Sequence, residues 1–581
     1  MSHVPADALA DMAADAAPDA REPGPRTTAE PDLGSLLWLR SLMVPHHCYV
    51  ESATGDRTLT YGDLGRATGR WRALLDDLGV PPGATVGIVA ADPLDFVHAF
   101  LGVIAAGRVA GPLDPRATDA ELVAVCDRVG PHLVVADRAA PVGAAGRAGR
   151  SGWDWVQLLG GAFGLASAPR DGPGDGPGSG GGRGGGLVLS TSGTTGAPKL
   201  IRLDERRLLH TARTVAAHHE LSAVDRGFSP LPLFHVNAEV VGLLATLVAG
   251  ATVVLDDRFH RRGFWEAMAR HRVTWLNAVP AILARLVPLE PGEALPATVR
   301  FARSASAPLP VAVLERFEAA TGIPVVETYG MTEAASQVTA NPLRGAKAGS
   351  VGRPTGAEVR VVRRQAGRGA GTEGAERADG APPGGVGRGA VGRVEIRGPG
   401  VISGYAGPGY EDRFDPEGWL DTGDLGYVDD DGYLFLVGRA DDVINRGGEK
   451  IHPREVEEVL LAEPGVAAVA VVGGDHAVLG RVPVAYVVGA GIGDAVGGGG
   501  DGTGAGDRAP SDRERAAALV ARLVARAEAE LSRPKRPAAF HVVGRLPQGP
   551  TGKVRRCALG GGGTAGEPGE PGAPVYSLLV S

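Results

Sequence analysis

Apolar runs typical of strands alternate with amphipathic segments typical of helices along the middle of this 581-residue chain. The run 187–190 precedes a polar loop and then the segment 206–221, whose apolar residues recur at helical spacing. The alternation repeats at 251–255, 264–272 and 273–279. Because strands that alternate with helices are typical of parallel sheets covered by helices, this pattern predicts an α/β fold with a largely parallel sheet.

The C-terminal part of the chain has a different pattern. Pro453 suits the first turn of an amphipathic helix, and Ser511 and Glu514 stand at capping-box spacing ahead of a second helix. Two strand-like runs, AAVAVVGG and VPVAYVVG, lie between them. These elements predict a small α+β unit near the C-terminus.

Three glycine-rich stretches, 168–186, 363–390 and 489–512, interrupt the periodic segments. They hold too few large apolar residues to offset the entropy of ordering, so we predict mobile surface loops. Residues 1–32 are acidic and rich in Ala and Pro, without the basic start and apolar core of a signal peptide, and predict a disordered leader. Residues 559–581 are predicted to be a flexible tail.

Charge and cysteine content narrow the class of protein. A net charge of −8 disfavours nucleic acid as a partner. The cysteines, Cys48, Cys126 and Cys557, are too far apart to indicate a disulfide framework or a zinc cluster. The longest apolar run, 240–255, is shorter than the roughly 18 residues that a membrane span needs. We therefore expect a soluble, cytoplasmic protein without a membrane span.

The polar loop STSGTTGAPK, residues 190–199, carries the first candidate chemistry. Hydroxyl groups, glycine backbone N–H groups and the cation of Lys199 together suit phosphate oxygens. The sequence lacks the G-x-x-x-x-G-K-[ST] pattern, since Gly552-Lys553 is followed by Val554, so a P-loop enzyme is disfavoured. Position directly after a strand and before a helix favours a phosphate loop, while a plain flexible loop remains the alternative.

Four further stretches carry chemistry in a fixed order. In ETYGMTEA, Tyr329 can stack on a base and Glu333 can hold Mg²⁺. In GWLDTGDLG, Asp424 can accept hydrogen bonds from ribose hydroxyls. GYLFLVGRADDVINRGGEKIHPREVE contains Arg439, and LPQGPTGKVRR offers Lys553 on a Gly/Pro turn. Each residue alone fits a core, turn or surface position, but all five stretches together indicate one nucleotide site.

Together these stretches resemble the AMP-forming acyl-CoA ligases of the adenylate-forming enzyme superfamily, over about residues 35–558 without the glycine-rich inserts. The resemblance implies a large N-terminal domain of packed, mostly parallel sheets with helices, residues 33–438, and a small mobile α+β C-terminal domain, residues 439–558. It implies an enzyme that uses ATP and Mg²⁺, with CoA as the co-substrate, to convert a carboxylic acid into a thioester. The acid first forms acyl-AMP and pyrophosphate, and a thiol then displaces AMP.

The resemblance also implies roles for individual residues. The expected ATP-binding residues are Thr191, Ser192, Gly193, Thr194, Thr195, Gly196, Lys199, Ser306, Ala307, Tyr329, Gly330, Asp424 and Arg439. The expected catalytic residues are Lys553, Glu333, Thr332 and His235, with Glu333 as the Mg²⁺ ligand. Lys553 would bridge the attacking carboxylate and the α-phosphate, where a cation stabilises the charge that develops between two anions.

A second half-reaction needs a second arrangement of the site. In the family the C-terminal domain rotates after adenylation, with Asp441 at the hinge position. Gly447 and Gly448 would line a channel for the pantetheine arm. His235, in PLFHVNAE, would face the carboxylate near the acyl pocket, although a structural histidine is the alternative.

Three residues depart from the family pattern. Leu200 and Arg393 stand where Gly and Glu are usual, and Asn445 stands where many relatives have Lys. Around the acyl pocket, RFARSASAPLP favours oxalate–CoA ligases, whereas FHVNAE favours fatty-acyl ligases and fatty acid metabolism. The identity of the acid therefore stays open, with a small or medium acid preferred. A ligase that loads an acyl carrier protein and a non-catalytic nucleotide-binding homologue are the alternatives.

Overall fold

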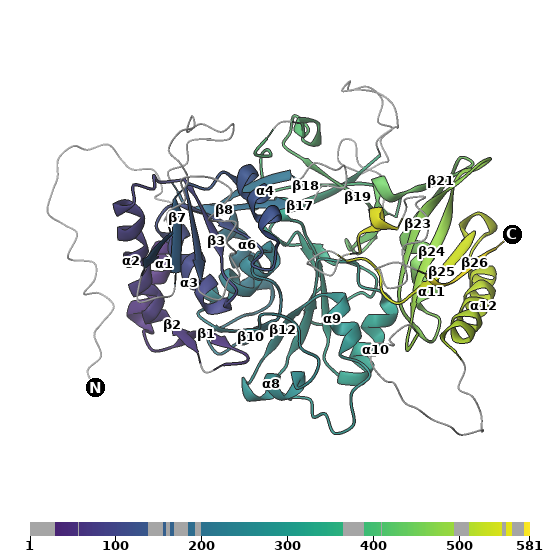
Figure 1. The fold of residues 1–581 in the computed structure, drawn as a ribbon, viewed down its shortest axis with the longest axis horizontal. Helices are drawn as coiled ribbons and strands as arrows, with labels where there is room; N and C mark the ends of the chain where they lie inside the picture. The colour runs from purple at the N-terminus through teal and green to yellow at the C-terminus, as the bar shows by residue number, and fades with distance from the viewer. Residues whose placement is uncertain are drawn as a thin grey trace. The chain divides into compact units, whose positions relative to one another are not determined.

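The structure of the chain is a computed structural model. It describes residues 30–55, 57–137, 155–158, 163–167, 184–191, 199–363, 389–407, 409–492, 511–548, 554–559 and 574–580. These residues form a mixed α/β fold with a large N-terminal sheet domain and a smaller C-terminal domain, as the alternation of strands and helices predicts (Figure 1).

The first sheet of the N-terminal domain has nine described strands. Its centre is parallel and places the carboxyl ends of several strands at one edge. The strand order is β16 (Arg353–Pro354), β15 (Thr339–Ala340), β14 (Val325–Tyr329), β13 (Phe301–Ser304), β12 (Trp275–Ala278), β10 (Arg226–Ser229), β11 (Thr252–Leu255), β1 (Cys48–Ser52) and β2 (Thr58–Thr60). The strands predicted within 251–255 and 273–279 are confirmed as β11 and β12. The π-helix η4 (Asn237–Leu244), between β10 and β11 in the chain, is fully buried.

The helices that follow these strands are short. They are α7 (Ala245–Ala249), α8 (Phe264–Arg270), α9 (Pro280–Arg285) and α10 (Val311–Thr321). The segment predicted as a helix at 264–272 is confirmed as α8.

The second sheet has seven described strands and carries the polar loop. Its order is β6 (Trp155–Leu158), β7 (Phe163–Ser167), β5 (Leu133–Asp137), β3 (Thr85–Val89), β4 (Val109–Pro112), β8 (Gly186–Thr191) and β9 (Lys199–Asp204). Its helices are α1 (Leu33–Met43), α2 (Tyr61–Asp77), α3 (Pro93–Ala105), α4 (Asp119–Val129) and α6 (Glu205–His218).

The position predicted for the polar loop, directly before a helix, is wrong. Strand β9 follows the loop and pairs antiparallel with β8, so Thr191 lies opposite Lys199, and α6 begins only at Glu205. Ile201 and Leu203 are buried, whereas Arg202 and Asp204 are exposed, and this alternation of period two is the local reason for a strand.

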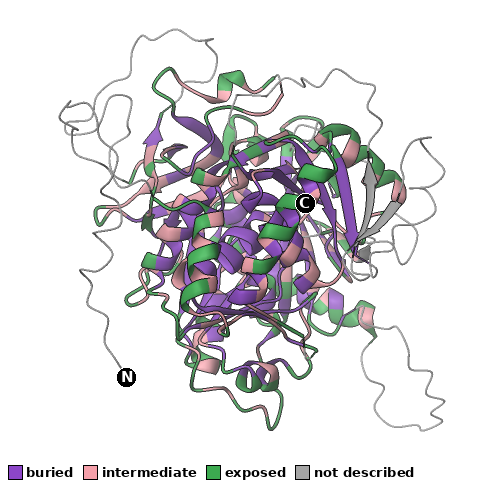
Figure 2. Ribbon diagram, turned by 90° about the vertical axis from the view of Figure 1, so that its left-hand side faces the viewer, coloured by how far each residue is buried: buried purple, intermediate pink, exposed green. Residues whose placement is uncertain are grey.

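A third, antiparallel sheet completes the N-terminal domain. It consists of β17 (Glu358–Val362), β18 (Gly392–Arg397), β19 (Leu420–Val428) and β20 (Leu434–Arg439). One continuous apolar core, from Leu33 to Leu434, joins all three sheets. Figure 2 shows these buried residues inside an exposed outer surface.

The C-terminal domain has its own apolar core, between a sheet and two helices. Its elements are β21 (Ile444–Arg446), β22 (Glu449–Ile451), α11 (Pro453–Leu461), β23 (Val466–His476), β24 (Gly480–Gly489), α12 (Asp512–Glu530), β25 (Ala539–Val543) and β26 (Pro574–Leu579). The predicted capping box of Ser511 and Glu514 is confirmed at the start of α12.

Predicted loop boundaries are wrong at three places, one of which is the insert 489–512, where Gly489 ends β24 and Asp512 begins α12. Residues 574–579 of the predicted tail form β26, which pairs with β25, and Tyr576 and Leu578 pack against the C-terminal core. This six-residue strand follows a Gly- and Pro-rich stretch that hid its pattern. Gly186, inside the predicted insert 168–186, begins β8. Residues 1–29 of the predicted leader and most of the three predicted inserts lie outside the described residues.

No helix in the described part of the chain is both long enough and apolar enough to cross a membrane.

Candidate active site

The turn after β14 starts the candidate site. β14 ends at Tyr329, and the 3₁₀ helix η5 (Thr332–Ala334) follows within a few residues. Gly330 lies between them, and a Cβ there would stand 1.4 Å from the carbonyl oxygen of Ser336. Only glycine fits this close approach. The turn therefore brings Tyr329, Thr332 and Glu333 to one edge of the nine-stranded sheet.

Tyr329, Asp424 and Arg439, which the sequence predicts to share a site, are in contact. The Tyr329 hydroxyl donates to Asp424 Oδ2 at 2.5 Å, and Arg439 Nη1 donates to Asp424 Oδ1 at 3.0 Å. Asp424 lies opposite Arg439 in the pairing of β19 with β20. Burial and the neighbouring Asp424 carboxylate raise the pKa of Tyr329 well above its usual value, so the phenol stays a hydrogen-bond donor.

Lys199 and Glu333 form the other half of the predicted phosphate region. Tyr405 joins them, because its hydroxyl donates to Glu333 Oε1 at 2.9 Å and Lys199 Nζ lies 5.1 Å from the centre of its ring. Lys199 Nζ also lies 4.8 Å from the ring of Tyr410. Burial lowers the pKa of Lys199, while nearby Glu333 acts in the opposite direction. The end of the polar loop is thus held beside η5.

Arg413 adds a third cation that the sequence interpretation missed. Its Nη1 and the Nη2 of Arg439 lie 3.0 and 2.9 Å from where a Cβ of Gly423 would stand. Both guanidinium groups also act to lower the pKa of Lys199. Arg413 stands in no recognisable motif, and Tyr405 carries no chemistry by itself, so only proximity in the fold identifies them. Three cations around this edge suit a polyanionic ligand.

Glu333 meets the requirements of a Mg²⁺ ligand. Its carboxylate is buried, Tyr405 engages Oε1, and Oε2 has no hydrogen-bond donor within the described ranges. A hard cation prefers such an oxygen beside phosphates. Asp256, Asp257 and His260 also gather potential ligand atoms within 4.8 Å of one another, but Arg258 donates to His260 Nε2 at 3.0 Å and places a positive charge there.

On the acyl side, His235 precedes the π-helix η4. Its Nε2 is buried without a hydrogen-bond partner among the residues described, and burial lowers the pKa of His235 to about 4. Asn237 Nδ2 donates to Ser306 Oγ at 3.1 Å, and Ser306 has φ 70°. A positive φ in a residue other than glycine is strained, and such residues cluster at functional sites. Ser306 and the half-buried Ala307 therefore lie beside the His235 segment.

Two groups of expected residues lie outside the described residues: the loop residues Ser192, Gly193, Thr194, Thr195 and Gly196, and Lys553. The chain on either side of them is placed. Thr191 and Lys199 pair at the base of the loop, and Gln548 pairs with Val554. Arg556 donates to both carboxylate oxygens of Glu457 at 2.7 and 2.9 Å. The roles of the loop and of Lys553 remain predictions.

Asp441 and the two glycines of the expected thiol channel are exposed. Asp441 lies in the 3₁₀ helix η7 (Ala440–Asp442), directly after β20. Gly447 and Gly448 form the turn between β21 and β22 with φ 57° and 97°. Asn445 Oδ1 accepts from the Gly448 N–H at 3.2 Å. The turn itself thus needs glycine, independently of any thiol.

Arg393 and Leu200, the other residues that depart from the family pattern, each contact a neighbouring element. Arg393 Nη1 contacts Asp421 Oδ2 at 3.0 Å, on the same strand as Asp424. The Leu200 carbonyl accepts from Ala406 N–H at 3.0 Å and links β9 to the segment that carries Tyr405.

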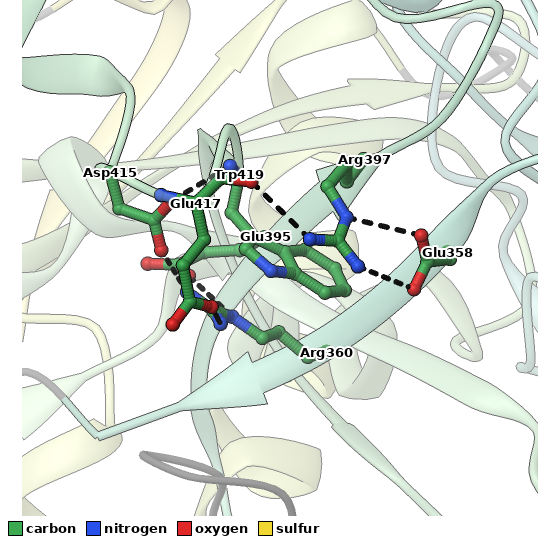
Figure 3. Close-up of polar contacts among 7 residues, drawn as sticks. All are labelled: Glu358, Arg360, Glu395, Arg397, Asp415, Glu417 and Trp419. Atoms are coloured by element: carbon green, nitrogen blue, oxygen red, sulfur yellow. Dashed lines mark hydrogen bonds and ion pairs between the residues drawn. The ribbon is translucent and has the colours of Figure 1, made fainter.

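A surface hollow of about 590 Å³ beside the third sheet is not a candidate site. Figure 3 shows the Trp419 ring between the guanidinium groups of Arg360 and Arg397, which lie 4.3 and 4.6 Å from its centre. Their donors bind Glu395, Asp415, Glu417 and Glu358, so the charges are already neutralised. This network stabilises the start of β19, the strand that carries Asp424.

The fold and the grouped residues define a nucleotide-dependent enzyme, and comparisons with known proteins agree. The family of AMP-binding enzymes matches residues 44–406, and the AMP-binding enzyme C-terminal domain matches residues 455–553. The chain is 36% identical to a sulfoacetate–CoA ligase of Cupriavidus necator over 91% of this chain and 97% of that protein. It is 36% identical to an oxalate–CoA ligase of Arabidopsis thaliana over 72% of this chain and 80% of that protein.

The fold is also that of solved relatives. An o-succinylbenzoate CoA synthetase from Bacillus subtilis, in complex with the acyl-adenylate intermediate, superimposes with a TM-score of 0.69 at 26% identity, covering 91% of this chain and 98% of that one. The same protein in complex with ATP and magnesium ion gives 0.68 at 26% identity, covering 90% and 98%. The chain belongs to the AMP-binding enzyme family. It is an AMP-forming acid–thiol ligase.

Proposed function

We propose that this chain activates a small carboxylic acid with ATP to form acyl-AMP, and then transfers the acyl group to the thiol of CoA. One observation carries the proposal: Tyr329, Asp424 and Arg439 meet in one network, beside a second network of Lys199 and Glu333. A nucleoside group suits the first network and phosphates suit the second. The roles below are proposed for this chain and are supported by this grouping.

In the adenylation step, the Asp424 carboxylate accepts hydrogen bonds from the ribose hydroxyls, and Arg439 keeps that carboxylate ionised and oriented. The Tyr329 ring lies against one face of adenine, and Ser306 and Ala307 lie near the other face of adenine. Lys199 and Arg413 bind the leaving pyrophosphate, which the loop 191–199 encloses. Thr332 contacts the α-phosphate. These contacts hold the α-phosphate in line with the attacking carboxylate.

Glu333 is the proposed ligand of Mg²⁺, which neutralises phosphate charge when bound. The role proposed for Lys553 is to bridge the acid carboxylate and the α-phosphate, where its charge would stabilise the charge that develops between them. Rotation about Asp441 then removes Lys553 and brings the Gly447–Gly448 turn to the site. Both glycines are exposed, and a Cβ at Gly448 would meet no atom within 4 Å, so this face of the turn is open.

Relatives favour a small, polar acid over a fatty acid. Sulfoacetate, oxalate and o-succinylbenzoate, the acids named for three relatives, each carry a second acidic group. We therefore propose an acid of this kind. A cytoplasmic location remains a prediction from the sequence.

An acyl carrier protein is the alternative acceptor, since it presents the same pantetheine thiol as CoA. The test is ATP–pyrophosphate exchange with acids from oxalate to fatty and aryl acids, followed by CoA or a carrier protein and detection of the thioester by mass spectrometry. We expect exchange with a small acid and a thioester on CoA. Exchange followed by thioester only on the carrier protein would favour the alternative. Nucleotide binding without turnover on any acid would contradict the proposal.

A further inference from the structure

Among the described residues, Arg303 is a fully buried arginine on the acyl side of the site without a counter-charge. Arg303, on β13, is 1% exposed. Its Nη1 donates to Asn237 Oδ1 at 2.8 Å and to Asn277 Oδ1 at 3.1 Å, and its Nη2 donates to Gln337 Oε1 at 3.4 Å. Every one of these acceptors is a neutral amide. Burial alone lowers the pKa of Arg303 to about 9, so the guanidinium is still protonated at neutral pH.

The hydrogen bonds leave one part of the guanidinium unused. A guanidinium has five N–H donors, and the two on Nη1 and one on Nη2 account for the three bonds. Nε is buried and has no partner among the described residues. Within the same residues Nη2 makes one hydrogen bond, to Gln337, and so has a second N–H available. These N–H groups lie on neighbouring nitrogen atoms. Two N–H groups so placed are the usual fork for a carboxylate or another oxyanion.

The three amides that hold Arg303 come from the segments expected around the reacting carboxylate. Asn237 lies two residues after His235 and donates to Ser306, and Gln337 adjoins Ser336, whose carbonyl packs against Gly330. Asn277 lies opposite Arg303 in the pairing of β12 with β13. By contrast, Arg393, Arg439 and Arg556 each contact a carboxylate directly. A buried cation without such a partner is costly unless an anion completes it.

We infer that Arg303 is the specificity-determining residue of the acid site and binds a second anionic group, a carboxylate or sulfonate, on the acid substrate. This inference rests on the proposed function, because the first carboxylate of the same acid is the group that attacks ATP. The second anion accepts the N–H groups of Nε and Nη2, while Asn237, Asn277 and Gln337 fix the guanidinium. An acid without a second anion leaves Arg303 uncompensated and therefore binds more weakly.

Matched pairs of acids test the inference by ATP–pyrophosphate exchange. Malonate is compared with monomethyl malonate, and sulfoacetate with methylsulfonylacetate, so that only the second charge changes. The wild-type enzyme is expected to prefer at least one anionic partner by about 10–100-fold in kcat/KM, as for a hydrogen bond to a charged group. Arg303→Met should reduce that ratio by a similar factor, and Arg303→Lys should restore part of it. The KM for ATP serves as the control, and it should stay unchanged in variants that alter the ratio of kcat/KM between the two acids of a pair.

A second variant covers the case in which Arg303→Met does not fold. Gln337→Glu is nearly isosteric and places a carboxylate at the position 3.4 Å from Nη2, so it should also reduce the anionic preference. No preference in the wild-type enzyme, or a preference that survives both Arg303→Met and Gln337→Glu, would overturn the inference while exchange itself supports the proposed function. Absence of exchange with every acid would instead refute the proposed function and, with it, the inference.

Discussion

The nucleotide side and the acyl side of the site differ in whether their cations lie near carboxylates of the protein. On the nucleotide side Arg439 faces Asp424, and Lys199 lies near Glu333, so each cation has a carboxylate of the protein nearby. On the acyl side, within the described residues, only amides bind Arg303, and His235 is a neutral imidazole whose Nε2 lacks a partner. The cations of the first side thus have carboxylates of the protein nearby before ligand binds, while Arg439 Nε and Glu333 Oε2 have no partner among the described residues. The second side has unsatisfied groups that a substrate can complete.

This difference separates what the two sides do. A paired network fixes side-chain positions in advance, which suits a ligand that is always the same. Unpaired buried donors reject ligands that fail to satisfy them, which suits selection among acids. Variants at Lys553, between the two sides, at Asp424 and Tyr405 on the nucleotide side, and at His235 on the acyl side test this difference.

Lys553→Ala, which removes the cation proposed to lie between the two sides, should have the largest effect. We expect acid-dependent pyrophosphate exchange to fall by about 10²–10³-fold, because a positioned charge that stabilises the transition state is lost. Thioester formation from supplied acyl-AMP should be spared. Lys535→Ala, in the same domain, is the control. Equal losses in both half-reactions would assign Lys553 a different role.

Asp424→Asn should damage the nucleotide side alone. It removes the carboxylate that Arg439 and Tyr329 share, and leaves both without their anionic acceptor. We expect kcat/KM for ATP to fall by about 100-fold, since the bonds lost are to a charged group. The preference between malonate and monomethyl malonate should change little. Asp475→Asn, at an exposed position, serves as the control. A comparable change in acid preference would show that the sides are not separable.

His235 links the acyl side to the pH dependence of stability. Its pKa of about 4 in the folded protein lies below the usual value near 6.5, because burial disfavours the charged imidazole. Between about pH 4 and 6.5 the unfolded chain therefore binds more protons at His235 than the folded protein does. The free energy of unfolding should rise with pH across this window, and this contribution to stability is lost as the pH falls through it.

The expected contribution is about 2 kcal/mol between pH 4.5 and 7. Urea unfolding of the wild-type protein and of His235→Gln at both pH values measures it. The variant should lose less stability on acidification than the wild type. Parallel losses in the two proteins would place the pKa of His235 near its ordinary value.

Tyr405→Phe should have the smallest effect. It removes the hydroxyl that donates to Glu333 at 2.9 Å and keeps the ring beside Lys199. One such hydrogen bond contributes about 1 kcal/mol, so we expect roughly a 3–5-fold lower kcat/KM at limiting Mg²⁺. Tyr427→Phe, in a ring stacked on Phe435, is the control. An unchanged Mg²⁺ dependence would mean that Tyr405 does not position Glu333.

The same contrast explains what the sequence predicted well. Tyr329, Asp424 and Arg439 stand in local patterns whose glycines and polar residues have few other uses, so the contact among these three residues and the α/β class were predictable. Arg303 lies in the stretch RFARSASAPLP, yet nothing local marked it as an arginine without a carboxylate partner. Its state depends on Asn237, Asn277 and Gln337, which come together only through strand pairing and the turn at Gly330.

Strand boundaries failed for a similar reason. β9 and β26 are short segments of period two, and each exists because a neighbouring strand accepts its hydrogen bonds. Local composition favoured a loop in both places. Arg413 and Tyr405 likewise acquire a role only when the fold brings them to Gly423 and Glu333.

The central claim is that the paired nucleotide side activates an acid chosen by the unpaired acyl side. The most direct measurement is rapid-quench analysis of the wild-type enzyme with ATP, Mg²⁺ and malonate, sulfoacetate or oxalate, first without CoA and then with it. The account predicts acid-dependent formation of acyl-AMP and pyrophosphate without CoA, and AMP with acyl-CoA once CoA is added. Formation of ADP, or AMP release that does not depend on the acid, would contradict it.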